Sequence, residues 1–468
     1  MCGICGYICI TAKGNSTKST SDDADNANNS LHMNDINNVS SKIKVMLEKI
    51  QHRGYDGSGI AVSNKTCIKN FSNIGKLDNV FNKTILNDLN GTYESKSLYG
   101  IGHTRYQTHG KLELVQPILN KYKNIALVHN GHVNAQNYEL DSQYILDVFE
   151  DNMYETSDVI NESNIFNSVE KIFKTIMGAY SCIILIHNVG LLIFRDPKGI
   201  RPLSYSVTDD GIYIASESCA IDTSTINTDI IDVLPGEAIL FKPDNMIKYQ
   251  TTNSYLSPCI FEYIYLAHPK SVLDKISVAK AREEFGKLLG NKIKKLNLQL
   301  DYVVPVPDSS CIAAKSLAQC LDIEYNRIID INPGRTFILP TQEKRKEAIK
   351  KKFIFNLNKI KGKNIFILDD SIVRGSTISH IVENIKLGNP NKIYVGSTSP
   401  QVIHKNIFGI SVPDTSKLIA YDRSCEEIAS IIGVDKVIYQ DLNEMKQSLK
   451  LLNKNIYDFE CCLFDGKY

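Results

Sequence analysis

Two adjacent carboxylates, Asp369 and Asp370, follow an apolar run at 365–368 and precede a short polar loop. The loop supplies hydroxyl groups, one cation and one glycine, on Ser371, Arg374, Gly375, Ser376 and Thr377. Glycine allows the backbone to curl, so N–H groups can converge on an anion where the following helical pattern begins. The carboxylates suit sugar hydroxyls or a hard cation such as Mg²⁺. Together these groups describe a site for a ribose 5-phosphate, whereas the plainer alternative is a strand–turn–helix with acids facing water.

A second candidate for chemistry lies at the N-terminus, which reads MCGICG. Removal of Met1 would place the α-amino group of Cys2 beside its own thiol. An α-amine has a pKa near ~7.7–8.0, so it can accept the thiol proton at neutral pH without a histidine. A cysteine at position 2 is more often incidental, so the nucleophile hypothesis depends on the motifs that follow.

Polar turns flank several expected strands in the first half of the chain. HRGYDGSG at 52–59 leads into a strand, whereas GHTRYQTHG at 102–110 and HNG at 129–131 end strands. Each could be an ordinary turn, because Gly and Asn are turn residues. After an N-terminal Cys-Gly-Ile-Cys-Gly, however, they together resemble the glutaminase domain of class II amidotransferases, which use an N-terminal nucleophile.

This resemblance implies that Cys2 attacks the amide of glutamine. It also implies that the Asn130 side chain and the Gly131 N–H form an oxyanion hole, where fixed donors stabilise the developing negative charge. Four residues are implied to bind glutamine: Arg105 at the α-carboxylate, Asp141 at the α-ammonium group, and Arg53 and Thr108 in support.

The chain length of 468 residues favours two or three domains. We expect a glutaminase domain over 2–252, folded as an αββα sandwich, and a second domain over 259–468. The polar stretch at 253–258 would link them. The tract at 11–42 is rich in Asn, Ser and Asp and poor in apolar residues, so we expect a disordered insertion there.

Composition excludes several classes of protein. The net charge is +1, which indicates neither a nucleic-acid nor an anionic-membrane partner. No apolar stretch approaches the ~20 residues of a membrane span. The 12 cysteines are scattered, and the Cys2-x-x-Cys5 pair has no second ligand pair at zinc-site spacing. We therefore expect a cytoplasmic protein with reduced thiols.

The second half carries further motifs: DYVVPVPDSS at 301–310, PGRTFI at 333–338 and LDDSIVRGST at 368–377. They resemble the parallel-sheet domain of type I phosphoribosyltransferases, which bind phosphoribosyl pyrophosphate (PRPP). With the N-terminal motifs, the whole chain resembles the amidophosphoribosyltransferase family. That resemblance implies conversion of glutamine, PRPP and water to 5-phosphoribosylamine, glutamate and pyrophosphate, with ammonia channelled between two sites, as the first committed step of purine synthesis.

The same resemblance implies ligands and partners for the second domain. The implied PRPP-binding residues are Asp369, Asp370, Ser371, Arg374, Gly375, Ser376, Thr377 and Arg335. One Mg²⁺ per subunit would bind at Ser310, Asp369 and Asp370. The basic run after Arg335 is interpreted either as a lid over PRPP or as a solvated helix face. We also expect a homo-oligomer, a dimer or tetramer, inhibited by purine nucleotides.

Departures from the family pattern leave alternatives open. Asn406, Glu460 and Leu463 occupy positions where one branch of the family has iron–sulfur cysteines, so we expect the cluster-free branch. The loop before Gly334 lacks the Lys, Arg and Tyr of many relatives, which leaves open a non-catalytic phosphoribosyl-binding regulator. The HRGYDGSG motif also leaves open a glucosamine-6-phosphate synthase.

Overall fold

The chain forms two compact units in its computed structural model. Unit 1 comprises Met1–Pro258, Ser271–Asp274 and Phe408–Ile410, and unit 2 comprises the remainder. The expected second domain, 259–468, is therefore not continuous, because two of its short segments belong to unit 1. The structure describes residues 2–10, 38–91, 97–107, 113–135, 137–153, 160–221, 228–331, 353–412 and 414–468.

Unit 1 is built on two antiparallel sheets. The first runs in the order β11 (Ile231–Asp232), β9 (Ser204–Val207), β10 (Gly211–Ala215), β1 (Gly3–Cys9), β4 (Tyr99–Arg105), β2 (Gly57–Ser63) and β3 (Ile68–Ile74). The second runs in the order β13 (Met246–Gln250), β12 (Glu237–Phe241), β8 (Gly190–Arg195), β7 (Gly178–Ile186), β6 (Ile125–Val133) and β5 (Ile118–Leu119).

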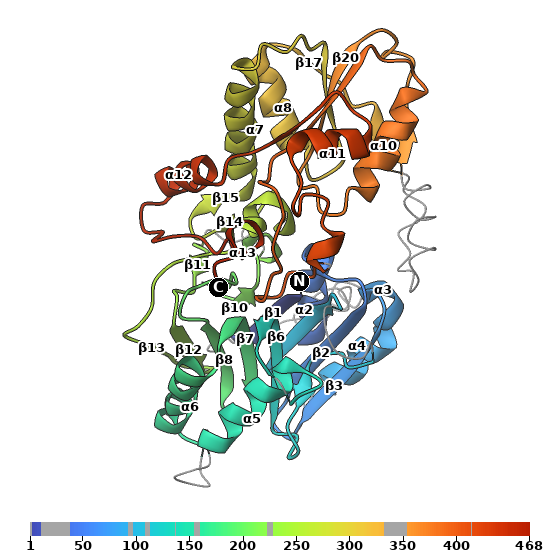
Figure 1. Cartoon of the computed structure of the whole chain (residues 1–468). Helices are drawn as coiled ribbons and strands as arrows, with labels where there is room; N and C mark the ends of the chain where they lie inside the picture. Colours follow the sequence, from blue (N-terminus) through green and yellow to red (C-terminus); the bar gives the residue numbers. More distant parts are fainter. Residues whose placement is uncertain are drawn as a thin grey trace. The chain divides into compact units, whose positions relative to one another are not determined.

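Alternating side chains explain why these sheets stack face to face. In β1, Ile4 and Ile8 pack in the core between the sheets, whereas Cys5 and Tyr7 belong to the outer core. Helices α2 (Val39–Lys49), α3 (Leu77–Val80) and α4 (Lys83–Asn90) cover the first sheet, and α5 (Asp141–Met153) and α6 (Glu162–Thr175) cover the second (Figure 1). This order of layers confirms the expected αββα sandwich.

The start of α2 corrects one boundary. The insertion was expected to extend to Lys42, but α2 begins at Val39, and the Asn38 side chain caps it by accepting the Ser41 N–H. Val39, Ile43 and Met46 are buried on one face of this helix, so residues 39–42 are anchored by helix packing. Residues 11–37 lie outside the described residues.

Unit 2 contains a five-stranded sheet in the order β17 (Glu324–Tyr325), β16 (Tyr302–Pro305), β20 (Asn364–Asp369), β21 (Lys392–Ser397) and β22 (Lys436–Tyr439). All its neighbouring strands are parallel, as expected. Helices α7 (Val278–Lys294) and α8 (Cys311–Leu321) pack on one face, and α10 (Ser376–Lys386) and α11 (Cys425–Ile432) pack on the other. The carboxyl ends of the strands therefore meet at one edge.

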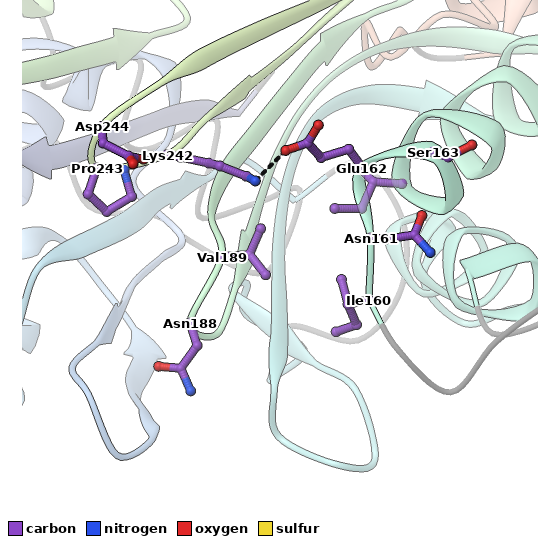
Figure 2. A pocket seen from close by; sticks show the side chains of 10 residues that line it. Ile160, Asn161, Glu162, Ser163, Asn188, Val189, Lys242, Pro243 and Asp244 are labelled. Carbon is purple, nitrogen blue, oxygen red and sulfur yellow. Dashed lines mark hydrogen bonds and ion pairs between the residues drawn. The ribbon is translucent and has the colours of Figure 1, made fainter.

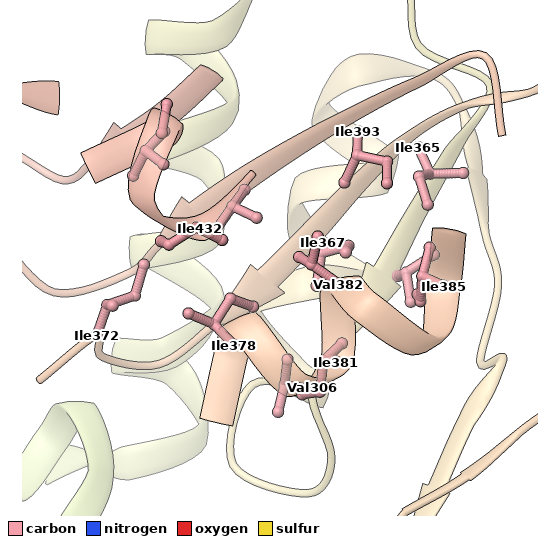
Figure 3. Packing of buried hydrophobic residues seen from close by; sticks show 14 of the residues in the cluster. Val306, Ile365, Ile367, Ile372, Ile378, Ile381, Val382, Ile385, Ile393 and Ile432 are labelled. Carbon is pink, nitrogen blue, oxygen red and sulfur yellow. The ribbon is translucent and has the colours of Figure 1, made fainter. Parts of the chain in front are cut away.

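Helical periodicity fixes how α10 sits on this sheet. Its buried residues recur at helical spacing: Ile378, Ile381, Val382 and Ile385. Figure 3 shows them beside Ile365 and Ile367 of β20. Burial of each such side chain contributes about 1.5–3 kcal/mol. The loop between β20 and α10 is thus held at both ends by the core.

The shorter elements complete the fold. They are 3-10 turns at Gln51–Arg53, Ser218–Ala220 and Thr415–Lys417, a π-helical turn at Glu262–Leu266, the strand pairs β14 (Val272–Leu273) with β15 (Ile276–Ser277) and β18 (Ile329–Ile331) with β19 (Phe353–Phe355), and helices α12 (Leu442–Leu452) and α13 (Cys462–Asp465). In the described part of the chain, no helix is long and apolar enough to cross a bilayer. All 12 cysteines are free thiols.

Candidate active sites

Cys2 lies immediately before β1, and an arginine side chain donates a hydrogen bond to its backbone. The Arg53 Nε donates a hydrogen bond to the Cys2 carbonyl at 2.9 Å. The Cys2 thiol lies 3.9 Å from the Tyr106 carbonyl oxygen, at the end of β4. Arg53 is buried, and its hydrogen bond to the nucleophile candidate is made to the main chain of Cys2.

The oxyanion-hole candidates occupy β6. Asn130 is fully buried, and within the described part of the chain neither polar atom of its amide has a hydrogen-bond partner. A buried amide without a partner is costly, which favours a ligand as the missing partner. Gly131 has φ +147°, and a Cβ there would lie 1.9 Å from the Ala179 oxygen. Only glycine therefore fits beside Asn130.

Asp141 is the first residue of α5, and hydrogen bonds fix its carboxylate. It accepts the Ser142 N–H at 2.9 Å and lies 3.2 Å from the His132 Nδ1. Burial by itself would raise the pKa of Asp141, but the His129 and His132 rings and the Val133 N–H lower it to about 2. Asp141 therefore keeps a negative charge near neutral pH, which suits an α-ammonium partner.

Arg105 ends β4 and is also buried. Its guanidinium donates to the Leu114 carbonyl. Burial lowers the pKa of Arg105, while the nearby Cys2, Asp56 and Asp141 oppose that shift. The negative charges of Cys2 and Asp141 thus favour the charged form of Arg105. Thr108 lies outside the described residues.

The acids of unit 2 lie at the carboxyl edge of the parallel sheet. Asp369 and Asp370 are both mostly buried, and the Asp369 Oδ1 accepts the Asp370 N–H at 2.9 Å. The Ser371 hydroxyl donates to the Asp370 carboxylate at 2.6 Å, and the Ser309 hydroxyl donates to it from the loop after β16. Two neighbouring loops therefore converge on Asp370.

Ser310 does not join this group. It is 1% exposed, and its hydroxyl donates to the Val306 carbonyl at 2.5 Å at the start of α8. The neighbouring Ser309 is the residue whose hydroxyl contacts Asp370, and metal contact by Ser310 stays a prediction. The Ser310 hydroxyl points away from Asp370 because it bonds the carbonyl four residues earlier in the chain.

The start of α10 has the form of an anion site. Gly375 has φ +78°, and a Cβ there would lie 2.3 Å from Ile419 Cδ1. Arg374 and Ser376 are exposed beside it, and Thr377 is half-buried. An 11-residue helix places its first N–H groups and its positive dipole end at this point. Arg335 lies outside the described residues.

Arg327 is a residue that sequence motifs missed. It follows β17, and its Nη2 lies 3.1 Å from Asp308 while its Nε donates to Asp330 at 2.8 Å. Asp308 belongs to the PDSS loop after β16, the neighbouring strand. The only available signal was position, because an arginine two residues past a parallel strand lies at the ligand edge of the sheet.

The donors at Asp369 and Asp370 are carboxylate and hydroxyl oxygens, which fit a hard cation such as Mg²⁺. No three His, Cys, Asp or Glu residues gather to hold a metal within the described ranges. Mg²⁺ is commonly bound by one or two carboxylates together with substrate phosphates and water, which two adjacent carboxylates would permit. At the positions compared with iron–sulfur cysteines, Asn406 Nδ2 lies 3.1 Å from Cys462 Sγ and 3.5 Å from Glu460 Oε1.

A separate pocket of about 690 Å³ opens beside the start of α6. Figure 2 shows Lys242 reaching Glu162 across it, with Val189 and Ile160 beneath. None of the expected site residues lines this pocket. It is therefore distinct from both candidate active sites.

Comparison with known proteins finds relatives that match most of the chain. A model of the glutamine amidotransferase domain matches residues 103–223. The amidophosphoribosyltransferase of Escherichia coli (strain K12) is 35% identical over 462 residues, which cover 92% of this chain and 90% of that protein. The amidophosphoribosyltransferase of Saccharomyces cerevisiae is 35% identical over 459 residues, which cover 90% and 87%.

A solved structure is similar across the whole chain. It is the glutamine PRPP amidotransferase of Bacillus subtilis in complex with ADP and GMP, with a TM-score of 0.78 and 27% identity over 100% of this chain and 97% of the other. A regulatory enzyme of purine biosynthesis has a TM-score of 0.81 at 26% identity, over 100% and 96%. Because the resemblance covers nine-tenths of the chain at 35% identity, this chain belongs to the amidophosphoribosyltransferase family.

Proposed function

We propose that Cys2, Asn130 and Gly131 release ammonia from glutamine, and that Asp369, Asp370 and the start of α10 hold the PRPP that receives it. As an amidophosphoribosyltransferase, the protein uses glutamine and PRPP in the first committed step of purine synthesis. The observation that carries the glutaminase assignment is the buried amide of Asn130 beside a position where only glycine fits.

In the glutaminase step, the Cys2 thiol transfers its proton to its own α-amine and attacks the amide carbon. This requires removal of Met1. The negative charge on the carbonyl oxygen is stabilised by the Asn130 amide and the Gly131 N–H. As this intermediate collapses, the α-amine passes the proton to the departing nitrogen, so ammonia leaves and a thioester remains, which water hydrolyses to glutamate and the free thiol. Arg105 and Asp141 hold the two charged groups at the α-carbon, with Arg53 and Thr108 in support.

In the transfer step, the α10 start binds the 5-phosphate through the N–H groups and hydroxyls after Gly375. Asp369 and Asp370 face the ribose hydroxyls, with Ser371 and Ser309 orienting Asp370. A bound Mg²⁺ would supply positive charge to the leaving pyrophosphate. Ammonia attacks C1 of the ribose, and pyrophosphate leaves with the bonding electrons. Arg374 and Arg335 add positive charge to the same ligand.

We also propose that Arg327 faces the pyrophosphate of PRPP. Asp308 lies in the loop after β16, at the same edge of the sheet as Asp369 and Asp370, and its negative charge would repel the pyrophosphate. The contact at 3.1 Å places a guanidinium beside this carboxylate, and a guanidinium also suits phosphate oxygens. Arg327 thus supplies a cation at the edge of the sheet where the loop before Gly334 has none.

The remaining expectations extend this proposal. We infer channelling of ammonia between the sites, a homo-oligomer that is a dimer or tetramer, regulation by purine nucleotides, and a cytoplasmic location. Nucleotide regulation is supported by the Bacillus subtilis neighbour, which was solved with ADP and GMP. The cluster-free branch stays a prediction, and iron and acid-labile sulfide analysis of the purified protein would test it.

The first experiment measures glutamate release from glutamine with and without PRPP and Mg²⁺. Stimulation by PRPP supports coupling between the two activities. Hydrolysis that is indifferent to PRPP would leave a glutaminase but contradict the coupled reaction. Formation of 5-phosphoribosylamine from ammonia, PRPP and Mg²⁺ tests the transferase independently. Its absence would favour the regulator alternative.

A further inference from the structure

Glu217 is a buried carboxylate for which the glutaminase chemistry gives no direct task. It lies just after β10, within unit 1, and its side chain is fully buried. Its Oε1 accepts from Arg53 Nη1 at 2.6 Å and lies 2.8 Å from the His52 Nε2. Burial would raise the pKa of Glu217, but the Arg53 and His52 groups hold it well below its usual range. The carboxylate is therefore ionised at neutral pH.

The Arg53 side chain of this ion pair also contacts the proposed nucleophile, Cys2. The same Arg53 guanidinium that contacts Glu217 donates through Nε to the Cys2 carbonyl. A planar guanidinium held by a carboxylate on one side has a fixed direction for its remaining donors. After the removal of Met1 that the proposed function requires, Cys2 has no preceding residue to hold it. Glu217 and Arg53 therefore supply an anchor for Cys2 that β1 by itself does not.

A second contact joins Glu217 to a segment from later in the sequence. The Ser271 hydroxyl donates to the Glu217 Oε2 at 2.7 Å. Ser271 opens the segment Ser271–Asp274, which belongs to unit 1 although the chain before and after it belongs to unit 2. We call this segment the strap.

Two further contacts fix the strap to unit 1. The Val272 N–H donates to the Ser218 hydroxyl at 2.7 Å, next to Glu217. At the other end of the strap, the Asp274 carboxylate accepts hydrogen bonds from both terminal nitrogens of Arg195, at 2.7 and 2.9 Å. Both partners of this forked pair are buried. After Lys275 the chain runs on to Val278, where α7 of unit 2 begins.

We propose that Glu217 positions the Cys2 nucleophile through Arg53, and that Ser271 makes this positioning depend on the transferase part of the chain. The strap is covalently continuous with unit 2 on both sides, so a change in unit 2 can pull on it. Loss or tightening of the Ser271 contact alters the hydrogen bonding of Glu217 and hence the direction of Arg53. The inference rests on Cys2 being the nucleophile of the proposed function.

The competing interpretation is that this cluster only stabilises the fold. The two interpretations differ in which activity they affect. The ammonia-dependent reaction uses the transferase site but not Cys2, so it reports on folding without reporting on the nucleophile. A positioning role lowers kcat for glutamine and spares its KM, whereas general damage to the fold lowers both activities.

The first test replaces Glu217 with glutamine, which keeps the size of the side chain and removes its charge. We expect kcat for glutamine to fall about 10- to 100-fold, because small displacements of a reacting group have effects of that size. The KM for glutamine and the ammonia-dependent rate should not change. Alkylation of Cys2 by iodoacetamide, a probe of its accessibility and reactivity, should also change in rate.

The matched control is Glu237→Gln. Glu237 is another buried glutamate of unit 1, on β12, where it is paired with Lys248 at 3.2 Å. It should leave both activities intact. An unchanged kcat in Glu217→Gln, or an equal loss of both activities, would overturn the positioning role.

The second test, Ser271→Ala, remains available if Glu217→Gln does not fold. The expected result is a loss of at least half of the stimulation of glutaminase by PRPP, about a twofold effect or more, because one hydrogen bond to a charged group is removed. Ser168→Ala is the control, since this buried hydroxyl of α6 donates to the Asn164 carbonyl of its own helix. Stimulation equal to that of the wild type, or a wild-type enzyme without stimulation, would overturn the coupling.

Cys2→Ala separates failure of this inference from failure of the proposed function. If Cys2→Ala still hydrolyses glutamine, the nucleophile assignment itself is wrong. If Cys2→Ala is inactive with glutamine and Glu217→Gln is fully active, only the positioning role is wrong.

Discussion

The two candidate sites of this enzyme are built in different ways. In unit 1, the charged groups around Cys2 are buried and paired, as the Arg53–Glu217 contact of 2.6 Å shows. In unit 2, Asp370 is held by hydroxyl groups, whereas Arg374 and Ser376 face solvent. The first site is largely assembled by the protein, and the second leaves charged groups available to a ligand.

The chemistry of each step explains this difference. The oxyanion of amide hydrolysis exists only briefly, so the donors that stabilise it must be in place beforehand. PRPP, in contrast, carries permanent charges and can itself order exposed side chains and a cation as it binds. Substitutions of Cys2 and of its oxyanion donors should therefore act on kcat for glutamine, and substitutions in unit 2 should act on PRPP use with either nitrogen source.

The largest separation of the two sites is expected from Cys2→Ala. Removal of the thiol should lower the glutamine-dependent rate by at least about 1,000-fold, since no other group in the proposal can form the thioester. The ammonia-dependent rate should stay at the wild-type level. Both rates are measured as pyrophosphate release, and a parallel loss of both would contradict independent sites.

Asn130→Ala tests whether the site in unit 1 is preorganised for the oxyanion. Loss of one oxyanion donor should lower kcat for glutamine about 100- to 1,000-fold with little change in KM. The control is Asn245→Ala, in the turn before β13, where the amide oxygen accepts the Met246 N–H. If Asn130→Ala mainly raises the KM for glutamine, Asn130 instead contributes to binding of glutamine in the ground state.

Asp370→Asn tests whether the site in unit 2 depends on charged groups that bind PRPP and a cation. It removes a charge from the proposed PRPP and Mg²⁺ site, so we expect about a 100-fold loss with both glutamine and ammonia. Asp322→Asn, at the end of α8, is the control. A loss confined to glutamine would show that Asp370 serves the glutaminase, against the assignment made here.

The charge of Asp141 should appear in the pH dependence of stability. Its pKa in the folded protein is lowered from 3.8 to about 2, so its contribution is fully present above pH about 4 and is lost as the pH falls toward 2. The difference in free energy of unfolding between wild type and Asp141→Asn should shrink by about 2 kcal/mol over that range. Urea unfolding measures it, with Asp151→Asn, an exposed acid of the same helix, as the control. A constant difference would contradict the proposed environment.

The smallest effect is expected from Arg327→Ala. Loss of one partly exposed cation should raise the KM for PRPP about tenfold, which corresponds to about 1.4 kcal/mol. The effect should weaken as salt concentration rises. Lys315→Ala, an exposed cation on α8, is the control. Equal changes in both variants would reduce Arg327 to a general surface charge.

Local chemistry explains which features could be predicted from the sequence. The strand, turn and helix around Asp369 and Gly375 lie in one short stretch, where apolar runs, a glycine and helical spacing all act over neighbouring residues. The same holds for Asn130 and Gly131 at the end of a strand. The αββα order and the parallel sheet followed from such patterns together with the family resemblance, and the structure confirms them.

Other features required the tertiary structure. Glu217 meets Arg53 across 164 positions of sequence, and Ser271 meets Glu217 across another 54. Periodicity and turn chemistry do not specify which distant carboxylate a given arginine will reach. Ser309 and Ser310 are neighbours of the same type, yet only the former contacts Asp370, because the start of α8 turns the latter inward.

The sequence by itself thus determined the nucleophile candidate, the candidate anion-binding loop at 371–377 and the class of each domain, because those depend on residue type and short spacing. The tertiary structure decided which charges are paired, which hydroxyl reaches the acids, and that Ser271–Asp274 belongs to the glutaminase unit. These depend on long-range packing, in which a buried charge takes whatever partner the fold brings within hydrogen-bonding distance.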